Sequence, residues 1–408
     1  MTLLDATQSN LSTDPGATEP ARASTTPSAP HWTGADPDSR WIAAARQLVP
    51  QLAERAVQHD RDGTFVADCF DQLRAQGFMS LLVPGELGGG GASHAEACAV
   101  LSELARGCPS TSLSYSMHSH VVGAQVWRHH HDLPAPVLGE VAAGQMTLIS
   151  TGASDWIESS GSAVQVDGGF RISARKMPAS GCPGGDVLVT SICWDDAPEG
   201  PQVIHCSIPF AADGVSIVPT WDTMGMRGTG SDTVVLDDVF VPDESVALIR
   251  PAGAWHPVWS VVLGTALPLI MSTYVGIAGL AAERAIELAS RRAERPDVAQ
   301  LTGRMLNRLA VGRDTVRAMI DASDNLHFDN TPEAAAAALT RKTNATEAGI
   351  DTVRIALAVG GGPAFGRQNG IERLFRDVHG ALYHPLSATR QERFTGRMAL
   401  GLDPLDGA

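Results

Sequence analysis

The sequence predicts a mostly helical protein of the α+β class, in which a compact β domain separates two helical regions. Apolar residues follow helical spacing from Asp38 to residue 145, lose it between Met146 and residue 250, and regain it afterwards. In the middle stretch, short β-branched runs alternate with Gly, Pro and Asp turns, which is typical of a barrel or a sandwich. We therefore divide the chain into residues 1–37, 38–145, 146–250 and 251–408.

Length and composition indicate a globular protein over most of the chain. With 408 residues, 44% of them hydrophobic, the chain can form two or three domains with substantial cores. The formal net charge of −15 repels phosphate backbones and argues against binding to nucleic acid or an anionic membrane surface. The six cysteines show no CxxC pair and no metal-ligand spacing, so we expect no metal site. Without a recognisable signal sequence, we expect a cytoplasmic location.

The first helical region follows a tail rich in Ser, Thr, Pro and Ala, which is predicted to be disordered. Asp38 is the expected cap of the first helix. Periodicity predicts further helices at Val66–Gln76, Ser93–Arg106, Ser110–His129 and Pro134–Ala143. The glycine-rich run 84–91 between them matches no phosphate-binding loop and predicts a flexible connection.

The β domain begins with a predicted hairpin. Residues 162–167 alternate in polarity, the turn Asp167-Gly168-Gly169 tolerates positive φ, and Phe170–Ser173 forms the returning strand. Further strands are predicted at Asp186–Ile192, Gln202–Ile208, Gly214–Val218 and Asp232–Leu236.

The last region predicts an antiparallel helical bundle. Its helices are expected at Val258–Arg292, Val298–Asn325, Pro332–Val359, Gln368–Gly380 and Leu386–Leu400. Between Arg250 and Glu283 no charged residue occurs, which is long enough to span a bilayer. Internal Gly and Pro residues and the lack of flanking basic and aromatic belts favour a buried central helix instead.

Five segments, in the expected order, resemble the acyl-CoA dehydrogenase superfamily of flavoproteins across nearly all of residues 40–402. They are Phe78–Gly89, Ser112–His120, Thr147–Asp155, Lys176–Gly181 and Trp221–Pro242. The third and fourth are similar to the family's "LTEPxAGSD" and "KxWITNG" segments, which cradle the isoalloxazine ring. The resemblance implies an N-terminal helical domain, a middle β-barrel domain and a C-terminal four-helix bundle.

The resemblance also implies a bound flavin, either FAD or FMN. Hydroxyls and backbone amides suit the N5 and N1/O2 edges of the ring, where charge collects during the reaction. The candidate cofactor-binding residues, matched by position, are Ser150, Thr151, Ala179, Ser180, Gly360 and Gly361. Strand ends and turns use the same residue types for structural reasons, and for Thr151 both interpretations stay open.

His384 is the candidate catalytic residue. The family's dehydrogenases use a glutamate as the base near the C-terminus, and His384 occupies that place in the run Leu382–Ser387. The family's other base position, in the run Thr265–Ser272, has no acid. These departures, with eroded contacts to the adenylate half of FAD, are similar to a branch of flavin monooxygenases that take reduced flavin from a separate reductase and use O2.

An imidazole titrates near neutrality, so His384 can act as an acid or a base. If Pro385 opens the last helix, His384 is its N-cap, where the helix dipole would keep the imidazole neutral.

The candidate substrate-pocket residues are His118, Tyr383 and Arg390. His118 lies where the related helix borders the substrate cavity, and His120, two residues on, must point to a different side of that helix. Arg390 could orient a substrate acid or belong to a solvated helix face. The run His129–His131 closes a helix, which favours a capping role over metal binding.

Together these features predict a flavin-dependent oxidoreductase, an oxygenase that acts on a small organic molecule with reduced flavin and O2. Two alternatives stay open: an acyl-CoA or acyl-carrier dehydrogenase that forms an α,β double bond with FAD, and a catalytically inactive structural homologue. The resemblance further implies a homodimer or homotetramer, in which the bundle completes a neighbour's flavin site.

Overall fold

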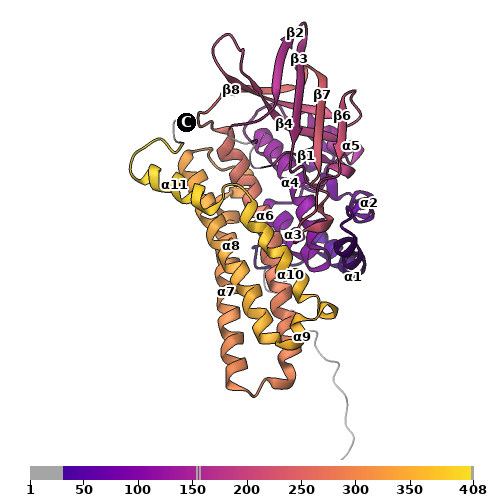
Figure 1. Cartoon of the computed structure of the whole chain (residues 1–408), viewed down its shortest axis with the longest axis vertical. Coiled ribbons are helices and arrows are strands. Elements are labelled where there is room, and N and C mark those ends of the chain that lie inside the picture. Colours follow the sequence, from indigo (N-terminus) through magenta and orange to yellow (C-terminus); the bar gives the residue numbers. More distant parts are fainter. Residues whose placement is uncertain (1–30, 153–154, 156–157, 406–408) are drawn as a thin grey trace, which may run out of the picture.

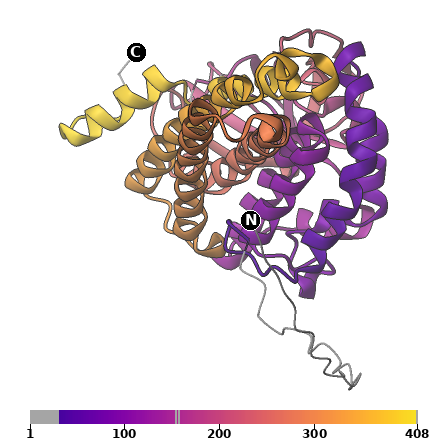
Figure 2. The same ribbon diagram turned by 90° about the horizontal axis from the view of Figure 1, so that it is seen from below.

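The computed structural model describes residues 31–152, 155 and 158–405, and it contains the three regions in the predicted order. The strands lie at one end of the molecule, the long helices extend away from them, and the N-terminal helices pack alongside (Figures 1 and 2). Most of the tail predicted to be disordered lies outside the described residues.

The N-terminal region is helical, as predicted. Its elements are α1 (Arg40–Asp62), α2 (Ala67–Ala75), η1 (Phe78–Ser80), η2 (Gly85–Leu87), α3 (His94–Gly107), α4 (Pro109–His130) and α5 (Val137–Gly144). The cap of α1 is Ser39 and not Asp38, because the Ser39 hydroxyl accepts a hydrogen bond from the N–H of Trp41 at 3.3 Å. A capping box of Ser93 and Glu96 starts α3.

In the glycine-rich run 84–91, which is expected to be a flexible connection, Gly89 and Gly90 pack closely against the core, whereas Gly85, Gly88 and Gly91 are exposed. A Cβ on Gly89 would collide with the backbone and side chain of Val83, and one on Gly90 would lie 2.6 Å from the Trp41 ring. The Trp41 indole also donates a hydrogen bond to the Gly90 carbonyl at 3.3 Å. Gly89 and Gly90 are therefore needed for close approach of backbone to the core, and not for mobility.

The β domain is built from two four-stranded sheets in the described part of the chain, with orders β1-β4-β5-β8 and β2-β3-β7-β6. The strands are β1 (Leu148–Ser150), β2 (Ser162–Val166), β3 (Gly169–Lys176), β4 (Val187–Trp194), β5 (Gln202–Pro209), β6 (Val215–Val218), β7 (Thr233–Pro242) and β8 (Val246–Pro251). Apolar residues of both sheets, such as Ile172 and Ile204, share one core. In the described residues the domain is thus a sandwich of two sheets, one of the two forms that the composition predicts, and not the single closed barrel that the resemblance implies.

The C-terminal region is the predicted bundle. Its elements are α6 (Val258–Ala289), η7 (Ser290–Arg292), α7 (Pro296–Ala322), η8 (Asp324–Leu326), α8 (Pro332–Gly360), α9 (Gly362–Phe365), η9 (Arg367–Asn369), α10 (Ile371–Val378), η10 (His379–Tyr383) and α11 (Ala388–Ala399). The long helices α6, α7 and α8 pack side by side, and α10 lies against α6 and α8 (Figure 1).

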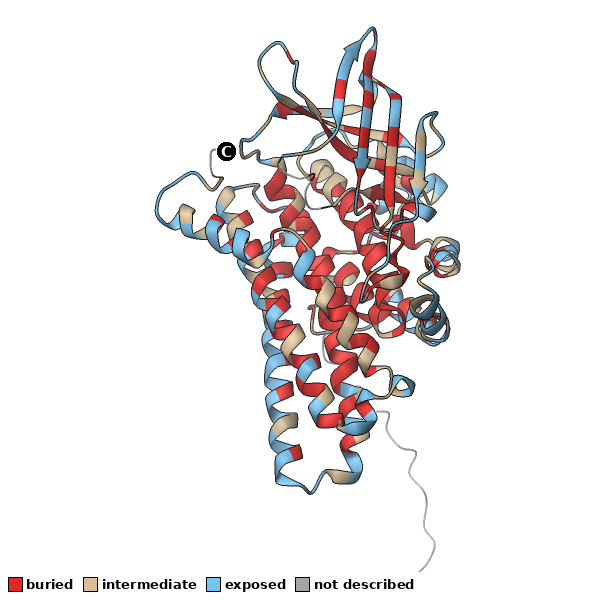
Figure 3. Cartoon of the chain, viewed as in Figure 1, coloured by how far each residue is buried: buried red, intermediate tan, exposed pale blue. Residues whose placement is uncertain are grey.

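Helix α6 is the centre of the bundle. The segment Val258–Arg292 is long and apolar enough to cross a membrane, yet 89% of its most apolar window is buried inside the protein. Figure 3 shows the contrast with α7, whose outer face is largely exposed. The packing of α6 against α3, α4, α7 and α8 confirms the predicted buried central helix.

Candidate active site

A cavity of about 610 Å³ lies where the three regions meet. Its walls come from α4, the end of β1, the loops that follow β3 and β6, α6, α10 and η10. Most of the lining is apolar, with Leu113 and Met117 from α4 and Leu267 and Ile270 from α6. Such a cavity can bind an organic molecule and exclude water from it.

One wall of the cavity carries hydroxyl groups. Ser150 and Thr151 lie at the end of β1, and Ser180 and Ser231 lie in the loops after β3 and β6. The hydroxyls of Ser180 and Ser231 are 2.8 Å apart and share one hydrogen bond. Because each hydroxyl has one donor and two acceptor sites, this wall keeps hydrogen-bonding capacity for a ligand. The structure therefore brings the predicted flavin-facing residues Ser150, Thr151 and Ser180 into one cavity.

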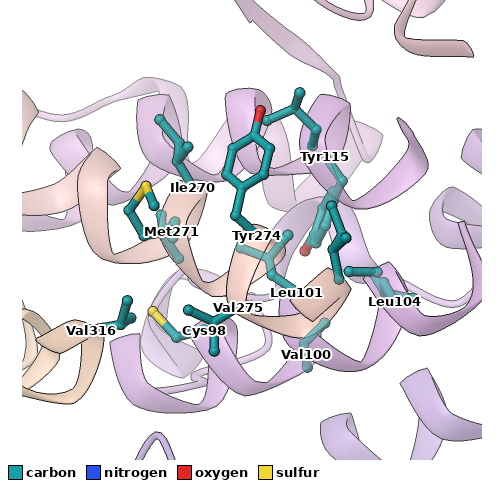
Figure 4. Packing of buried hydrophobic residues seen from close by; sticks show 14 of the residues in the cluster. Cys98, Val100, Leu101, Leu104, Tyr115, Ile270, Met271, Tyr274, Val275 and Val316 are labelled. Atoms are coloured by element: carbon teal, nitrogen blue, oxygen red, sulfur yellow. The ribbon is translucent and has the colours of Figure 1, made fainter. Parts of the chain in front are cut away.

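The opposite wall contains His384 and Tyr274. The His384 imidazole nitrogen Nε2 and the Tyr274 hydroxyl are 2.8 Å apart and form a hydrogen bond. Figure 4 shows the Tyr274 side chain rising from α6, with its hydroxyl directed away from the cluster of Met271 and Val275. The ring Nδ1 of His384 has no hydrogen-bond partner among the described residues, which leaves this atom for a ligand in the cavity.

The surroundings of His384 favour the neutral imidazole. Burial, together with the charges of Lys342 and His120, lowers the pKa of His384 from 6.5 to about 3. The predicted direction of the pKa shift was right, but the predicted cause, the dipole of the last helix, was wrong. Helix α11 begins at Ala388 with Ser387 as its N-cap, so His384 lies before the helix and does not cap it.

His118 is not a pocket residue, contrary to the prediction. Its Nε2 is 2.8 Å from the Met79 carbonyl oxygen, and its Nδ1 accepts a hydrogen bond from the N–H of Leu148 at 3.0 Å. Both ring nitrogens are therefore used to join η1, α4 and β1. The two histidines do point to different sides of α4, and His120 is the one that lines the cavity.

Of the other two predicted pocket residues, one lines the cavity and the other does not. Tyr383 lines the cavity, as expected. Arg390 does not, because its guanidinium lies on the surface and pairs with the Glu158 carboxylate at 3.2 Å. The solvated-face interpretation of Arg390 is therefore the correct one.

Three predicted cofactor residues lie outside the lining of this cavity in the described chain. The N–H of Ala179 donates to the Asp232 carbonyl at 3.2 Å, so it holds its loop in place. Gly360 and Gly361 lie at the end of α8, where Arg292 donates to the Gly360 carbonyl at 3.0 Å. Contact of this turn with a neighbour's flavin stays a prediction.

Several lining residues were not found by sequence reasoning. Tyr274 could have been noticed, because it follows Leu267 and Ile270 at helical spacing and supplies a hydroxyl within a charge-free helix. Trp221 and Met226 lie in the resembling segment Trp221–Pro242, but the loop after β6 has no periodicity that would direct their side chains into the cavity. That loop is fixed by the buried Asp377, whose carboxylate accepts a hydrogen bond from the Met226 N–H at 2.6 Å.

The titratable side chains of the lining are Arg376, the tyrosines Tyr274 and Tyr383, and the histidines His120, His379 and His384. No Asp or Glu belongs to the lining within the described ranges. The imidazoles are therefore the candidates for a base in this cavity.

Two family models match the chain. Residues 40–133 match the model of the acyl-CoA dehydrogenase N-terminal domain, and residues 263–382 match that of the C-terminal domain. With the cavity and its hydroxyl wall, these matches define a flavin-dependent oxidoreductase. The chain belongs to the acyl-CoA dehydrogenase superfamily.

Individual relatives cover most of the chain. Putative acyl-CoA dehydrogenase YdbM of Bacillus subtilis is 29% identical over 376 residues, which are 86% of this chain and 94% of the relative. L-evernosamine nitrososynthase of a Micromonospora species is 27% identical over 406 residues, 91% of this chain and 94% of the relative. A crystal structure of KijD3 with FMN and dTDP-3-amino-2,3,6-trideoxy-4-keto-3-methyl-D-glucose has a TM-score of 0.80 at 26% identity, covering 90% of this chain and 95% of that one.

Proposed function

We propose that the protein is a flavin-dependent monooxygenase that uses reduced flavin and O2 to oxygenate a small organic molecule, with His384 as the acid or base. The observation that carries the proposal is the replacement of the family's carboxylate by His384, in a cavity whose described lining has no Asp or Glu. Relatives that oxygenate nitrogen, such as the nitrososynthase, support the same reaction class.

The residues present fit a flavin. The volume of about 610 Å³ lies within the range of roughly 300–1,000 Å³ that is usual for ligand sites. Ser150, Thr151, Ser180 and Ser231 place hydroxyl groups on one wall, and Trp221 and Met226 add apolar surface for a ring. When bound, the flavin supplies the electrons that activate O2.

The chain's own residues would bind the substrate and move its proton. The apolar side chains of α4 and α6 exclude water, which strengthens hydrogen bonds inside the cavity. The neutral His384 can accept a proton at Nδ1 from a substrate N–H or O–H group. Tyr274 fixes the ring orientation through its hydrogen bond to Nε2. Apolar walls with few polar groups suit a neutral aromatic, sulfide or amine.

We also propose a separate flavin reductase as a partner and a homodimer or homotetramer as the assembly. The position of Gly360 and Gly361 outside the cavity supports the second proposal, because the family resemblance assigns such a turn to a neighbour's flavin. The cytoplasmic location stays a prediction.

Dehydrogenation of an acyl-CoA is the second candidate, and similarity to putative acyl-CoA dehydrogenase YdbM favours it. It would require a base in place of the family's glutamate, and the described lining of the cavity offers no carboxylate for that role. We therefore favour the oxygenase.

Replacing His384 tests the proposal. His384→Ala and His384→Gln should lower turnover by about 10²–10⁴-fold, because they remove general acid–base catalysis. Flavin affinity should stay within about twofold, since the hydroxyl wall is intact. Turnover is measured with NADH, a flavin reductase and a panel of aromatics, sulfides and amines.

His129→Ala is the matched control, because His129 is a half-exposed histidine whose neighbour is the surface residue Glu86. It should leave turnover unchanged. Full activity of both His384 variants would contradict the assigned role.

A further inference from the structure

A second cavity, of about 520 Å³, lies at the other end of α10. It is formed by α1, α6, η9 and the start of α10, and it shares no lining residue with the active-site cavity. We call it the arginine cavity. Its charged lining residues are Asp60, Arg61, Arg284, Glu287, Arg367, Glu372 and Arg373.

Two of the acidic residues that line this cavity, Asp60 and Glu372, already accept hydrogen bonds from Arg376. Both oxygens of Asp60 accept hydrogen bonds from Arg376, at 2.8 and 2.6 Å, and Glu372 accepts one from the same guanidinium at 2.9 Å. The other acid of the lining is Glu287, whose negative charge acts to raise the pKa of Arg284 on the same helix. Arg61 pairs with Asp62.

Three arginines are left without such partners. Within the described part of the chain, no carboxylate lies within ion-pair distance of Arg284, Arg367 or Arg373. Burial lowers the pKa of Arg284, and repulsion from Arg373 and Arg106 lowers it further. Guanidinium groups that are held together inside a protein are costly unless an anion compensates them.

Arg373 is the least accessible of the three. It is 7% exposed, and its buried Nε atom has no hydrogen-bond partner. Its charge opposes the raised pKa of Asp377, one turn along α10, but the two side chains form no ion pair. A buried N–H donor without an acceptor is rare in proteins and points to a ligand that supplies one.

The start of α10 adds further donors. Gly370 is its N-cap, with φ of 67°, and the helix continues for eight residues to Val378. The first backbone N–H groups of a helix have no acceptor inside that helix, and its dipole favours negative charge there. Gly370 and Arg373 both line the arginine cavity, so backbone and side-chain donors are directed to the same place.

We propose that the arginine cavity binds the phosphate group of a small molecule through Arg284, Arg373 and the start of α10. Arg367 lies at the cavity rim and adds charge. The site is independent of the flavin and of the proposed oxygenase reaction.

Calorimetry on the full-length, flavin-free protein tests the site with two probes, inorganic phosphate and AMP. We expect saturable binding of at least one probe, weakened about tenfold or more by Arg284→Gln and by Arg373→Gln, because each removes a charged donor. Binding of AMP alone would show that a phosphomonoester needs its organic part to bind, and binding of both would show that the phosphate group is sufficient. Arg354→Gln is the control, since Arg354 is an exposed arginine of α8 that pairs with Asp351.

Two results would overturn the proposal. The first is the absence of saturable binding of both probes to the wild-type protein. The second is a loss of FMN affinity, but not riboflavin affinity, in the arginine variants, because it would assign these arginines to the flavin's own phosphate. If Arg373→Gln does not fold, Arg284→Gln decides alone, since Arg284 is less buried and its loss leaves no cavity in the core.

Discussion

His384 is held between a hydroxyl and a cation. Tyr274 bonds to its Nε2, and Lys342 lies nearby on α8, with its ammonium donating to the Leu386 carbonyl at 3.0 Å. Lys342 is only 2% exposed, and burial lowers its pKa to about 8. The ammonium of this buried lysine, bonded to the carbonyl of a residue two positions after His384, disfavours a second positive charge on the imidazole. These neighbours therefore keep the His384 imidazole neutral well below pH 7.

This environment predicts an unusual pH profile. The pKa of His384 is lowered from 6.5 to about 3, so the neutral form is present above the lowered pKa and is lost only as the pH falls through it. We expect kcat to show no inflection near pH 6.5 when it is measured between about pH 5 and 8. Lys342→Met should move the acid inflection upward, because it removes a charge that lowers the pKa. A fall in kcat with a midpoint of 6 to 7 in the wild-type protein would contradict the account.

Sequence reasoning could locate His384, Ser150 and Ser180, because each lies at a recognisable position of a resembling segment. It could not choose between His118 and His120, since helical spacing says that they diverge but not which side faces the cavity. It also could not place Arg390, because a surface ion pair with Glu158 joins residues far apart in the sequence. These choices depend on tertiary packing.

Helix α6 links the active-site residue Tyr274 to the packing of the helices. Small residues along α6 allow neighbouring helices to approach closely. The backbone of Gly276 approaches α3 so closely that an added Cβ would lie 2.5 Å from the Ser102 carbonyl oxygen. Figure 4 shows α6 and α3 in contact near Val275 and Leu101. Tyr274 is one residue away, so the same contact fixes the hydroxyl that orients His384.

Gly276→Ala tests this contact. The added methyl would meet backbone that cannot rotate away, so we expect a loss of about 1–3 kcal/mol in the free energy of unfolding. Gly303→Ala is the control, because Gly303 is an exposed position of α7 with nothing within 4 Å of the new Cβ. Alanine there should stabilise by up to about 1 kcal/mol. Urea denaturation measures both, and equal effects of the two substitutions would contradict the packing argument.

Most elements could be predicted from periodicity, since α6, α7 and α8 carry long apolar patterns. Strand β8 was missed because Val246–Pro251 is short, half-exposed and ends in Arg250 and a proline. Its pairing with β5 is a long-range contact that a local pattern does not contain. The tight packing of Gly89 and Gly90 was missed for the same reason.

At the scale of the molecule, the cavity exists only where all three regions meet. The buried histidines His94 and His118 hold the N-terminal region to its neighbours, while the buried His120 bonds within α4. His94, for example, lies 2.7 Å from the Ser323 hydroxyl and 3.1 Å from the Thr265 carbonyl. Burial lowers the pKa of each of the three from 6.5 to about 4. The assembled structure thus depends on neutral imidazoles.

This dependence predicts acid sensitivity. The unfolded chain binds protons on these histidines below pH 6.5, whereas the folded chain does so only near pH 4, so stability is present above 6.5 and is lost as the pH falls. As the pH falls from 6.5 to about 4, each histidine should lower the free energy of unfolding by roughly 1.4 kcal/mol per pH unit. Asp377 has the opposite effect on the free energy of unfolding. Burial raises its pKa to about 6, so its protonation favours the folded chain as the pH falls. Urea midpoints at pH 7, 6 and 5 should fall steadily, and a constant midpoint would show that these histidines are not buried as described.

The central claim is that this cavity oxygenates a substrate with reduced flavin and O2. The most direct measurement supplies the purified protein with FMN, NADH, a flavin reductase, isotopically labelled O2 and the substrate panel, and follows the label by mass spectrometry. We predict that one labelled oxygen atom enters the product, and that the His384→Ala protein forms far less of it. Oxidation of an acyl-CoA with an artificial electron acceptor, in the absence of O2 and without label in the product, would contradict the account.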